Sequence, residues 1–204
     1  HDPLRRQRQM CIRDSPKIKP VDIQKVVVIG GGLMGSGIAM CMANAGISVT
    51  IIESSKKLLD RCWNNITANY QSTQTMGRLS QEQVKSRLRL IDVSLEFEKV
   101  SDADLVIEAV FENMELKKDI FRKVGKLAKK NAILASNTSA LDLNTLSESS
   151  GRPQDVIGLH FFSPANVMRL LEVVRAQKTS VGVIYTCMKL SLIHISEPTR
   201  LSTI

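Results

Sequence analysis

Short apolar runs alternate with longer amphipathic segments along most of the chain. Four of the runs are rich in branched aliphatic residues: KVVVIG (25–30), SVTIIES (48–54), ADLVIEAV (103–110) and NAILAS (131–136). Continuous apolar runs of this length predict strands that are buried on both faces, as in a parallel sheet. A further short strand is expected at residues 89–93.

The segments between these runs have the spacing of amphipathic helices. Helices are expected at residues 38–46, at 56–87 with a break near Gly77, at 116–130, at 141–148 and from residue 181 onward. In the segment 116–130, four apolar residues share one face that we expect to pack against the sheet: Leu116, Ile120, Val124 and Leu127.

Two further apolar runs, DVIGLHFF (155–162) and MRLLEVVR (168–175), are joined by a turn that contains Pro164. Strands so close in sequence predict an antiparallel pair. Elsewhere strands and helices alternate, which is typical of an α/β fold with a mostly parallel sheet. The pattern therefore predicts a mostly parallel α/β sheet with one antiparallel strand pair near its C-terminal end.

Residues 30–35, GGGLMG, fit the pattern GxGxxG and lie between an expected strand and an expected helix. In such a turn Gly30 allows the tight bend, Gly32 lets a pyrophosphate approach the backbone, and Gly35 lets the helix pack on the strand. The helix N-terminus, with Leu33 and Met34 in its first turn, faces the phosphates. The context predicts a Rossmann-type, doubly wound domain that binds a dinucleotide. The alternative is a glycine-rich turn without a ligand.

Glu53 ends the second expected strand, where an acidic side chain accepts hydrogen bonds from the adenosine ribose hydroxyls. A carboxylate there repels the 2′-phosphate of NADP, so it favours NAD as the cofactor. Lys56 and Lys57 lie close by and soften that discrimination. The alternative is a solvated glutamate at a strand end.

The two ends of the chain resemble translated DNA tags used in sequencing libraries. MCIRDS (10–15) can be encoded by ATG TGT ATA AGA GAC AG, and the reverse complement of that DNA encodes LSLIH (190–194) and the start of the next isoleucine. We therefore expect residues 1–20 to be a tag-derived leader and linker, 21–189 the domain, with its last helix truncated, and 190–204 a tag-derived tail. Such segments are set aside in fold reasoning.

This division changes the meaning of the formal net charge of +8. Residues 1–20 contribute +4 and residues 190–204 contribute nothing, so the domain keeps +4. No basic–aromatic interleaving is present, which argues against a nucleic-acid partner. The four cysteines form no CxxC pair, so we expect reduced thiols, an intracellular location and no metal site. No segment has the length of a membrane-spanning helix.

Three more segments, EAVFENMELKK (108–118), SNTSALD (136–142) and HFFSPANVMRLLEVV (160–174), complete a recognisable pattern. With the phosphate turn, they resemble the NAD-binding domain of L-3-hydroxyacyl-CoA dehydrogenases over about residues 24–189. The resemblance implies NAD-dependent oxidation of a 3-hydroxyacyl-CoA to the 3-ketoacyl-CoA in fatty-acid β-oxidation. The first and third segments are more similar to multifunctional enzymes, in which an enoyl-CoA hydratase domain precedes this one.

The family uses a His–Glu pair, and His160 and Glu172 match it. His160 is the only histidine in residues 21–189. Removal of a hydride from a secondary alcohol requires a base for the hydroxyl proton, and histidine titrates near neutral pH. A carboxylate on the second ring nitrogen orients the imidazole and stabilises its protonated form. A lone histidine on an apolar strand can also be a core residue, but an unpaired glutamate between leucine and valine is costly.

The resemblance assigns further site residues. Ser139 matches a residue that contacts the substrate oxygen, and Asn137 matches one on the nicotinamide side. The alternative for Ser139 is that it opens the next helix as part of a capping box. Glu112 and Lys117 match positions near the nicotinamide ribose, and Ala109 matches another position that binds the cofactor. Lys117 also begins a lysine-rich segment, for which a solvated helix face is the alternative.

The prediction is thus an oxidoreductase domain with an acyl-CoA substrate, from a dimeric or multifunctional enzyme of the bacterial cytoplasm, peroxisome or mitochondrion. In the family a helical domain follows and completes the cleft, so residues 1–204 alone are expected to turn over poorly. Two alternatives remain: a dehydrogenase of a free hydroxy acid or sugar acid, and a nucleotide-binding relative without catalysis. The His–Glu pair argues against the second.

Overall fold

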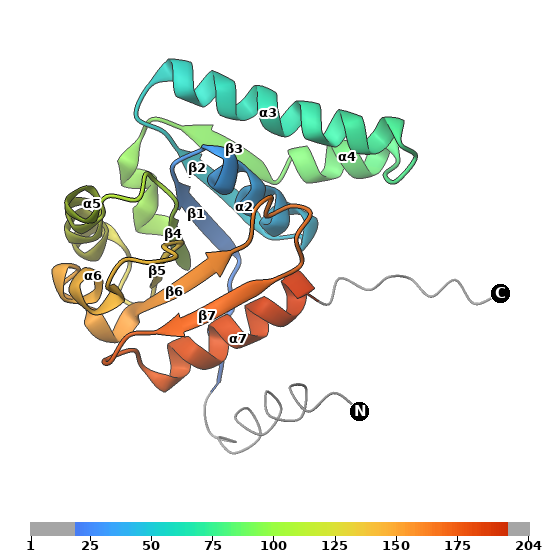
Figure 1. Ribbon diagram of the computed structural model, residues 1–204. Coiled ribbons are helices and arrows are strands. Elements are labelled where there is room, and N and C mark those ends of the chain that lie inside the picture. The colour runs from blue at the N-terminus through green and yellow to red at the C-terminus, as the bar shows by residue number, and fades with distance from the viewer. Residues whose placement is uncertain (1–18, 196–204) are drawn as a thin grey trace, which may run out of the picture.

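Seven strands form one sheet in the computed structural model, which describes residues 19–195 (Figure 1). The sheet order is β3-β2-β1-β4-β5-β6-β7. The strands are β1 (Lys25–Ile29), β2 (Ser48–Ile52), β3 (Ile91–Ser94), β4 (Leu105–Glu108), β5 (Ile133–Ser136), β6 (Val156–Phe161) and β7 (Leu171–Arg175). All neighbours are parallel except β6 and β7, which are antiparallel. The predicted Rossmann-type fold, with one antiparallel pair, is confirmed.

Helices cover both faces of the sheet because successive strand residues point to opposite sides. Val26 and Val28 belong to one hydrophobic core and Val27 and Ile29 to the other. The first core contains residues of α2 (Leu33–Asn44), α3 (Lys56–Thr75), α4 (Gln81–Leu88) and α7 (Val181–Ile195). The second contains residues of the 3-10 helix η1 (Phe97–Asp102), α5 (Met114–Leu127) and α6 (Leu143–Ser149), while η2 (Pro153–Asp155) leads into β6.

By the rule for doubly wound sheets, the order of the strands predicts a ligand crevice at one edge of the sheet. The chain moves outward from β1 through β2 to β3 and then returns to place β4 on the other side of β1. Loops that leave β1 and β4 therefore diverge above the carboxyl ends of these strands, where doubly wound folds bind ligands. The carboxyl ends of β5 and β6 lie along the same edge.

Capping side chains mark the starts of α3, α5 and α6. The Ser55 side chain accepts a hydrogen bond from the Leu58 amide at the start of α3, and Asn113 caps α5 in the same way. Asp142 caps α6 by accepting bonds from the amides of Asn144 and Thr145. The alternative role of Ser139 as the cap of this helix is therefore wrong, because the helix begins at Leu143.

One predicted helix face is corrected by the structure. Leu116 and Leu127 are about 40% exposed, at 41% and 42%, whereas Ile120 and Val124 are buried as expected. The buried face of α5 also contains Lys117 and Phe121, so it is rotated from the predicted stripe. The interpretation of Lys117 as part of a solvated face is wrong, because that residue is 1% exposed.

The last helix, α7, continues past the predicted boundary at residue 189 and reaches Ile195. The tag assignment of 190–204 stays a prediction that rests on the codon argument. The leader at 1–18, with Cys11, and the tail at 196–204 lie outside the described residues. Within residues 19–195, no helix is both long and apolar enough to cross a membrane. Cys41, Cys62 and Cys187 are buried and form no disulfide bond with one another.

Candidate active site

The glycine turn after β1 is shaped by close backbone contacts. Gly30 has a φ of +95°, and a Cβ at this position would lie 2.9 Å from the Ala109 carbonyl oxygen. A Cβ on Gly35 would lie 1.7 Å from the carbonyl oxygen of Gly30, so α2 packs directly on the turn. A Cβ on Gly32 would meet no atom within 4 Å. Gly30 and Gly35 are thus required by the protein itself, while Gly32 borders open space.

The start of α2 has the features of a phosphate site. Its N-cap is Gly32, which makes no side-chain cap, and its first turn carries no acidic residue. Leu33 is 70% exposed and Met34 is partly buried against the core. Helix N-termini attract anions through their free amides and their dipole. The open backbone at Gly32 and the uncapped first turn therefore fit the pyrophosphate of NAD.

Glu53 lies beside this turn, at the end of β2. Its Oε1 accepts a 2.7 Å hydrogen bond from the Gly31 amide, and its Oε2 accepts one of 3.0 Å from the Ser54 amide. The carboxylate is thereby held next to the glycine turn. Lys56 forms an exposed ion pair with Asp60 at 2.8 Å, so its charge is already engaged on the surface of α3.

Gly31 is a site residue that the GxGxxG pattern did not single out. A Cβ there would lie 2.6 Å from the Cys62 Sγ, so α3 approaches the turn too closely for any side chain. Burial, and secondly the charge of Glu53, raise the pKa of the Cys62 thiol to about 12. The one sequence signal for Gly31 was its place in a run of three consecutive glycines.

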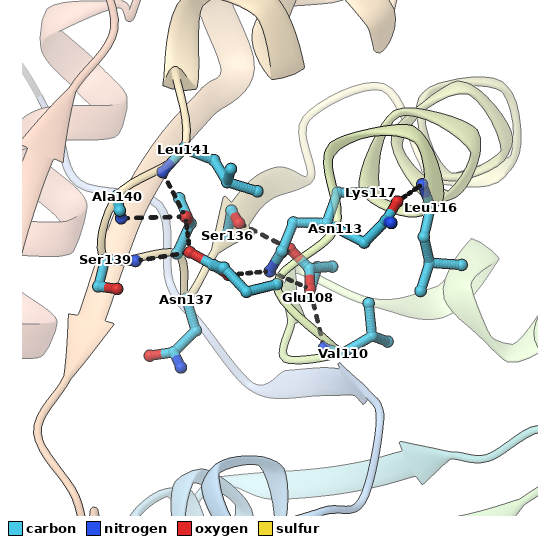
Figure 2. A network of polar contacts seen from close by, with 12 residues as sticks. Glu108, Val110, Asn113, Leu116, Lys117, Ser136, Asn137, Ser139, Ala140 and Leu141 are labelled. Atoms are coloured by element: carbon cyan, nitrogen blue, oxygen red, sulfur yellow. Dashed lines mark hydrogen bonds and ion pairs between the residues drawn. The ribbon is translucent and has the colours of Figure 1, made fainter.

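A buried ion pair lies between the ends of β4 and β5 and the helix α5. The Lys117 Nζ is 2.7 Å and 2.9 Å from the two carboxylate oxygens of Glu108, and both side chains are at most 2% exposed. The Ser136 hydroxyl donates to Glu108 Oε2 at 2.6 Å, and the Val110 amide donates to Oε1 at 2.8 Å. Figure 2 shows Lys117 and Ser136 pointing toward Glu108.

Glu112 connects this pair to the loop after β5. Its Oε2 is 3.1 Å from the Lys117 Nζ, and its Oε1 accepts hydrogen bonds from the Thr138 hydroxyl and, at 3.2 Å, from the Ser139 amide. Partial burial acts to raise the pKa of Glu112, but the bonds from Thr138 and Lys117 outweigh it and lower that pKa. Ser139 itself is exposed at the crevice edge.

Asn137 joins the ends of β5 and β6. Its Oδ1 accepts a 2.9 Å hydrogen bond from the Phe161 amide, which follows directly after His160. Figure 2 shows its side chain pointing away from the Glu108 cluster. Of the sequence-predicted residues, Glu112 and Ser139 therefore share one polar network, while the Asn137 side chain bonds separately to β6 at the same carboxyl edge of the sheet. Ala109 joins this edge through its backbone, which lies against Gly30.

His160 and Glu172 face each other across the antiparallel pair. They are register partners of β6 and β7, and His160 Nδ1 is 3.0 Å from Glu172 Oε2. The imidazole is 23% exposed and the carboxylate 56% exposed. The Phe162 ring lies 4.8 Å from the imidazole, centroid to centroid. The pair is therefore partly exposed to solvent rather than enclosed in the core.

The loop after His160 is anchored on α2. Ala165 is buried, and the Cys41 thiol donates a 3.1 Å hydrogen bond to its carbonyl oxygen. A Cβ on Gly37 would lie 3.1 Å from the Ala165 Cβ, so the helix has a glycine where this loop touches it. The helix that carries the phosphate turn thus also supports the loop between His160 and Glu172. Within residues 19–195, no group of three or more His, Cys, Asp or Glu side chains is arranged to hold a metal ion.

Known proteins match this arrangement in sequence and in structure. Residues 25–196 match the family described as 3-hydroxyacyl-CoA dehydrogenase, NAD binding domain. The peroxisomal fatty acid beta-oxidation multifunctional protein AIM1 of Arabidopsis thaliana is 42% identical over 171 residues, which are 84% of this chain and 24% of that protein. The peroxisomal bifunctional enzyme of Danio rerio is 45% identical over 173 residues, or 84% and 23%.

A solved structure, the 3-hydroxybutyryl-CoA dehydrogenase of Escherichia coli K12, superposes with a TM-score of 0.83 at 34% identity. The match covers 85% of this chain and 37% of that one. The chain spans about a quarter of the length of the two multifunctional relatives. The NAD-binding domain that the sequence predicted is confirmed by the family match, and this chain belongs to the family of 3-hydroxyacyl-CoA dehydrogenase NAD-binding domains.

Proposed function

We propose that the protein oxidises the 3-hydroxyl group of a 3-hydroxyacyl-CoA to a ketone with NAD. The observation that carries the proposal is the His160–Glu172 pair, 3.0 Å apart at the carboxyl end of β6, along the same edge of the sheet as the glycine turn after β1. Such a pair supplies the base that alcohol oxidation requires. The names of the relatives, which act in fatty acid beta-oxidation or on 3-hydroxybutyryl-CoA, support the substrate class.

The geometry of the pair determines how the proton moves. Glu172 can only accept at His160 Nδ1, so the neutral imidazole carries its proton there and presents the lone pair of Nε2. Nε2 then takes the proton of the substrate hydroxyl. The carboxylate stabilises the imidazolium that results and keeps the ring in the productive orientation. NAD, when bound, supplies the acceptor for the hydride that leaves the carbon bearing this hydroxyl.

The other predicted residues hold the two ligands in place. The turn of Gly30, Gly32 and Gly35, with the first turn of α2, binds the pyrophosphate, and Glu53 binds the adenosine ribose. Glu112 binds the nicotinamide ribose, with Lys117 beside it. The Ser139 hydroxyl binds the substrate oxygen, and Asn137 fixes the β6 backbone next to His160 through the Phe161 amide.

The domain's context follows from the same relatives. We propose that it works within a longer multifunctional β-oxidation protein, because the multifunctional relatives are about four times its matched length. The names of the two multifunctional relatives support a peroxisome as the compartment in a eukaryote, and in a bacterium we propose the cytoplasm.

The test compares wild type with His160→Gln in the natural gene product that carries this domain. We expect His160→Gln to lower kcat by about a hundredfold or more, with the NAD dissociation constant changed less than about threefold. The assay follows NADH absorbance with 3-hydroxybutyryl-CoA as substrate, and free 3-hydroxybutyrate is the comparison. Activity on the free acid rather than on the thioester would favour a dehydrogenase of free hydroxy acids. Full activity of the variant would refute the assignment of the base.

A further inference from the structure

The mechanism above leaves one buried carboxylate without a role. Glu108 ends β4, where the alternation of the strand directs its side chain toward α5, and it is 1% exposed. It lies beside the candidate site, because its register partner on β5 is Ser136, the residue before Asn137. Figure 2 shows the Glu108 carboxylate at the centre of the polar cluster at this edge.

Packing alone does not account for Glu108 and Lys117. Removing two charges from water costs free energy that their attraction repays only with good geometry, and an apolar pair of similar volume is often as stable. Here the geometry is complete. An ammonium has three N–H donors, and three carboxylate oxygens lie within 3.1 Å of the Lys117 Nζ: both of Glu108 and one of Glu112. The contacts with Glu108 orient the Lys117 ammonium group, so its remaining donor determines where the Glu112 carboxylate lies.

That third partner reaches the site. Glu112 is 41% exposed, and its other oxygen accepts from the Thr138 hydroxyl and the Ser139 amide. A chain of contacts thus runs from the core residue Glu108 through Lys117 to Glu112 and on to the backbone of the loop at 138–141. Because Glu108 and Lys117 are buried, their side chains have little freedom to move, and they hold the Glu112 carboxylate in one position.

We propose that Glu108 is a positioning residue of the site, which acts through Lys117 to hold Glu112 and the backbone of Ser139. The inference deepens the proposed function, since it assumes that Glu112 and Ser139 face the cofactor and substrate. Lys117, with its three donors directed at carboxylates, acts in the same way and contributes to cofactor binding through Glu112.

The test replaces the buried ion pair by an apolar pair, Glu108→Leu with Lys117→Met, in the 204-residue chain. We expect this double variant to unfold at the same urea concentration as wild type or at a higher one. We expect its NAD dissociation constant, measured by calorimetry, to rise about tenfold. Without cofactor, the Ser139 amide should exchange its hydrogen about tenfold faster, because Glu112 is no longer held.

Single variants show whether Glu108 acts through Lys117. Glu108→Gln should weaken NAD binding about tenfold in the wild-type chain but less than about twofold when Lys117 is already methionine. The matched control is Glu115→Gln, which removes an exposed partner of Lys118 on the same helix and should change neither readout.

Each result supports or overturns the proposal. A double variant that folds and binds NAD as tightly as wild type would overturn it, as would additive effects in the cycle. A double variant that fails to fold would also overturn it, because the pair would then serve stability. Failure of the proposed function looks different: the natural gene product that carries this domain would leave 3-hydroxyacyl-CoA unoxidised, while the NAD and exchange effects persisted in the 204-residue chain.

Discussion

Two glycines of the phosphate turn should respond in opposite ways to the same added methyl group. Gly35→Ala places a Cβ 1.7 Å from the Gly30 carbonyl oxygen, whereas an ordinary contact is 3.4–4 Å. To restore an ordinary contact of 3.4 Å the helix α2 must retreat from the turn by about 1.7 Å, which loosens its packing on the first hydrophobic core. Overpacking of this kind costs about 1–3 kcal/mol, and a backbone contact belongs at the upper end. We expect Gly35→Ala to lower the free energy of unfolding by about 3 kcal/mol.

Gly32→Ala is the matched control, because its Cβ meets no protein atom within 4 Å and the backbone there is extended. Alanine is a poorer N-cap than glycine by a few tenths to about 1 kcal/mol. The reduced entropy of the unfolded chain returns about 0.4–1 kcal/mol. The net change in the free energy of unfolding should thus stay within about 0.5 kcal/mol. In the proposed cofactor site its methyl group takes the space of the pyrophosphate, so NAD affinity should fall about tenfold or more.

Urea unfolding followed by circular dichroism measures the first quantity, and calorimetry with NAD measures the second. A Gly35→Ala variant as stable as wild type would show that α2 does not pack on the turn as described. A Gly32→Ala variant that loses more than about 2 kcal/mol would show that the space beside Gly32 is needed by the protein rather than by a ligand. Unchanged NAD affinity in Gly32→Ala would remove this turn from the cofactor site.

Two further predictions concern stability. Arg152 donates to four backbone carbonyls of residues 128–132 and to Asp155. Arg152→Ala should therefore lower the free energy of unfolding in urea by about 2–3 kcal/mol, whereas the exposed control Arg122→Ala should lower it by less than about 0.5 kcal/mol. Equal losses in the two variants would contradict this. Burial raises the pKa of the Cys62 and Cys187 thiols from 9.0 to about 12, secondarily through Glu53 for Cys62. Because the fold favours the neutral thiols, stability should fall as pH rises above 9. A thiol reagent at pH 8 should modify neither Cys62 nor Cys187 before unfolding, and rapid labelling of either residue in the native chain, located by peptide mapping, would refute this.

The sequence pattern was sufficient for the architecture, because the relevant signals are local. Apolar runs of strand length separated by helical spacing require a layered α/β fold, and the turn at 30–35 fixes where its ligand edge lies. The pairing of His160 with Glu172 was also predictable, since a short connection between two strands makes them neighbours. Their exact register, with Nδ1 3.0 Å from the carboxylate, needed the structure.

The sequence was insufficient where a side chain's surroundings come from distant segments. Lys117 lies among lysines on α5, and no residue near it in the sequence shows that its ammonium group pairs with a carboxylate from β4. That carboxylate in turn accepts a hydrogen bond from a hydroxyl on β5. The predicted apolar stripe of α5 failed for the same reason, because a long ammonium chain is buried when the sheet supplies its partners.

The sequence by itself thus determined the layers, the order of strands and helices, the glycine turn and the candidate base with its acid. Only the tertiary structure decided that Glu108 pairs with Lys117, that Gly31 is packed under α3, and that Lys117 is buried. The physical reason is that periodicity records which face of an element is apolar. The burial of a charge depends instead on partners that a parallel sheet brings together from far along the chain.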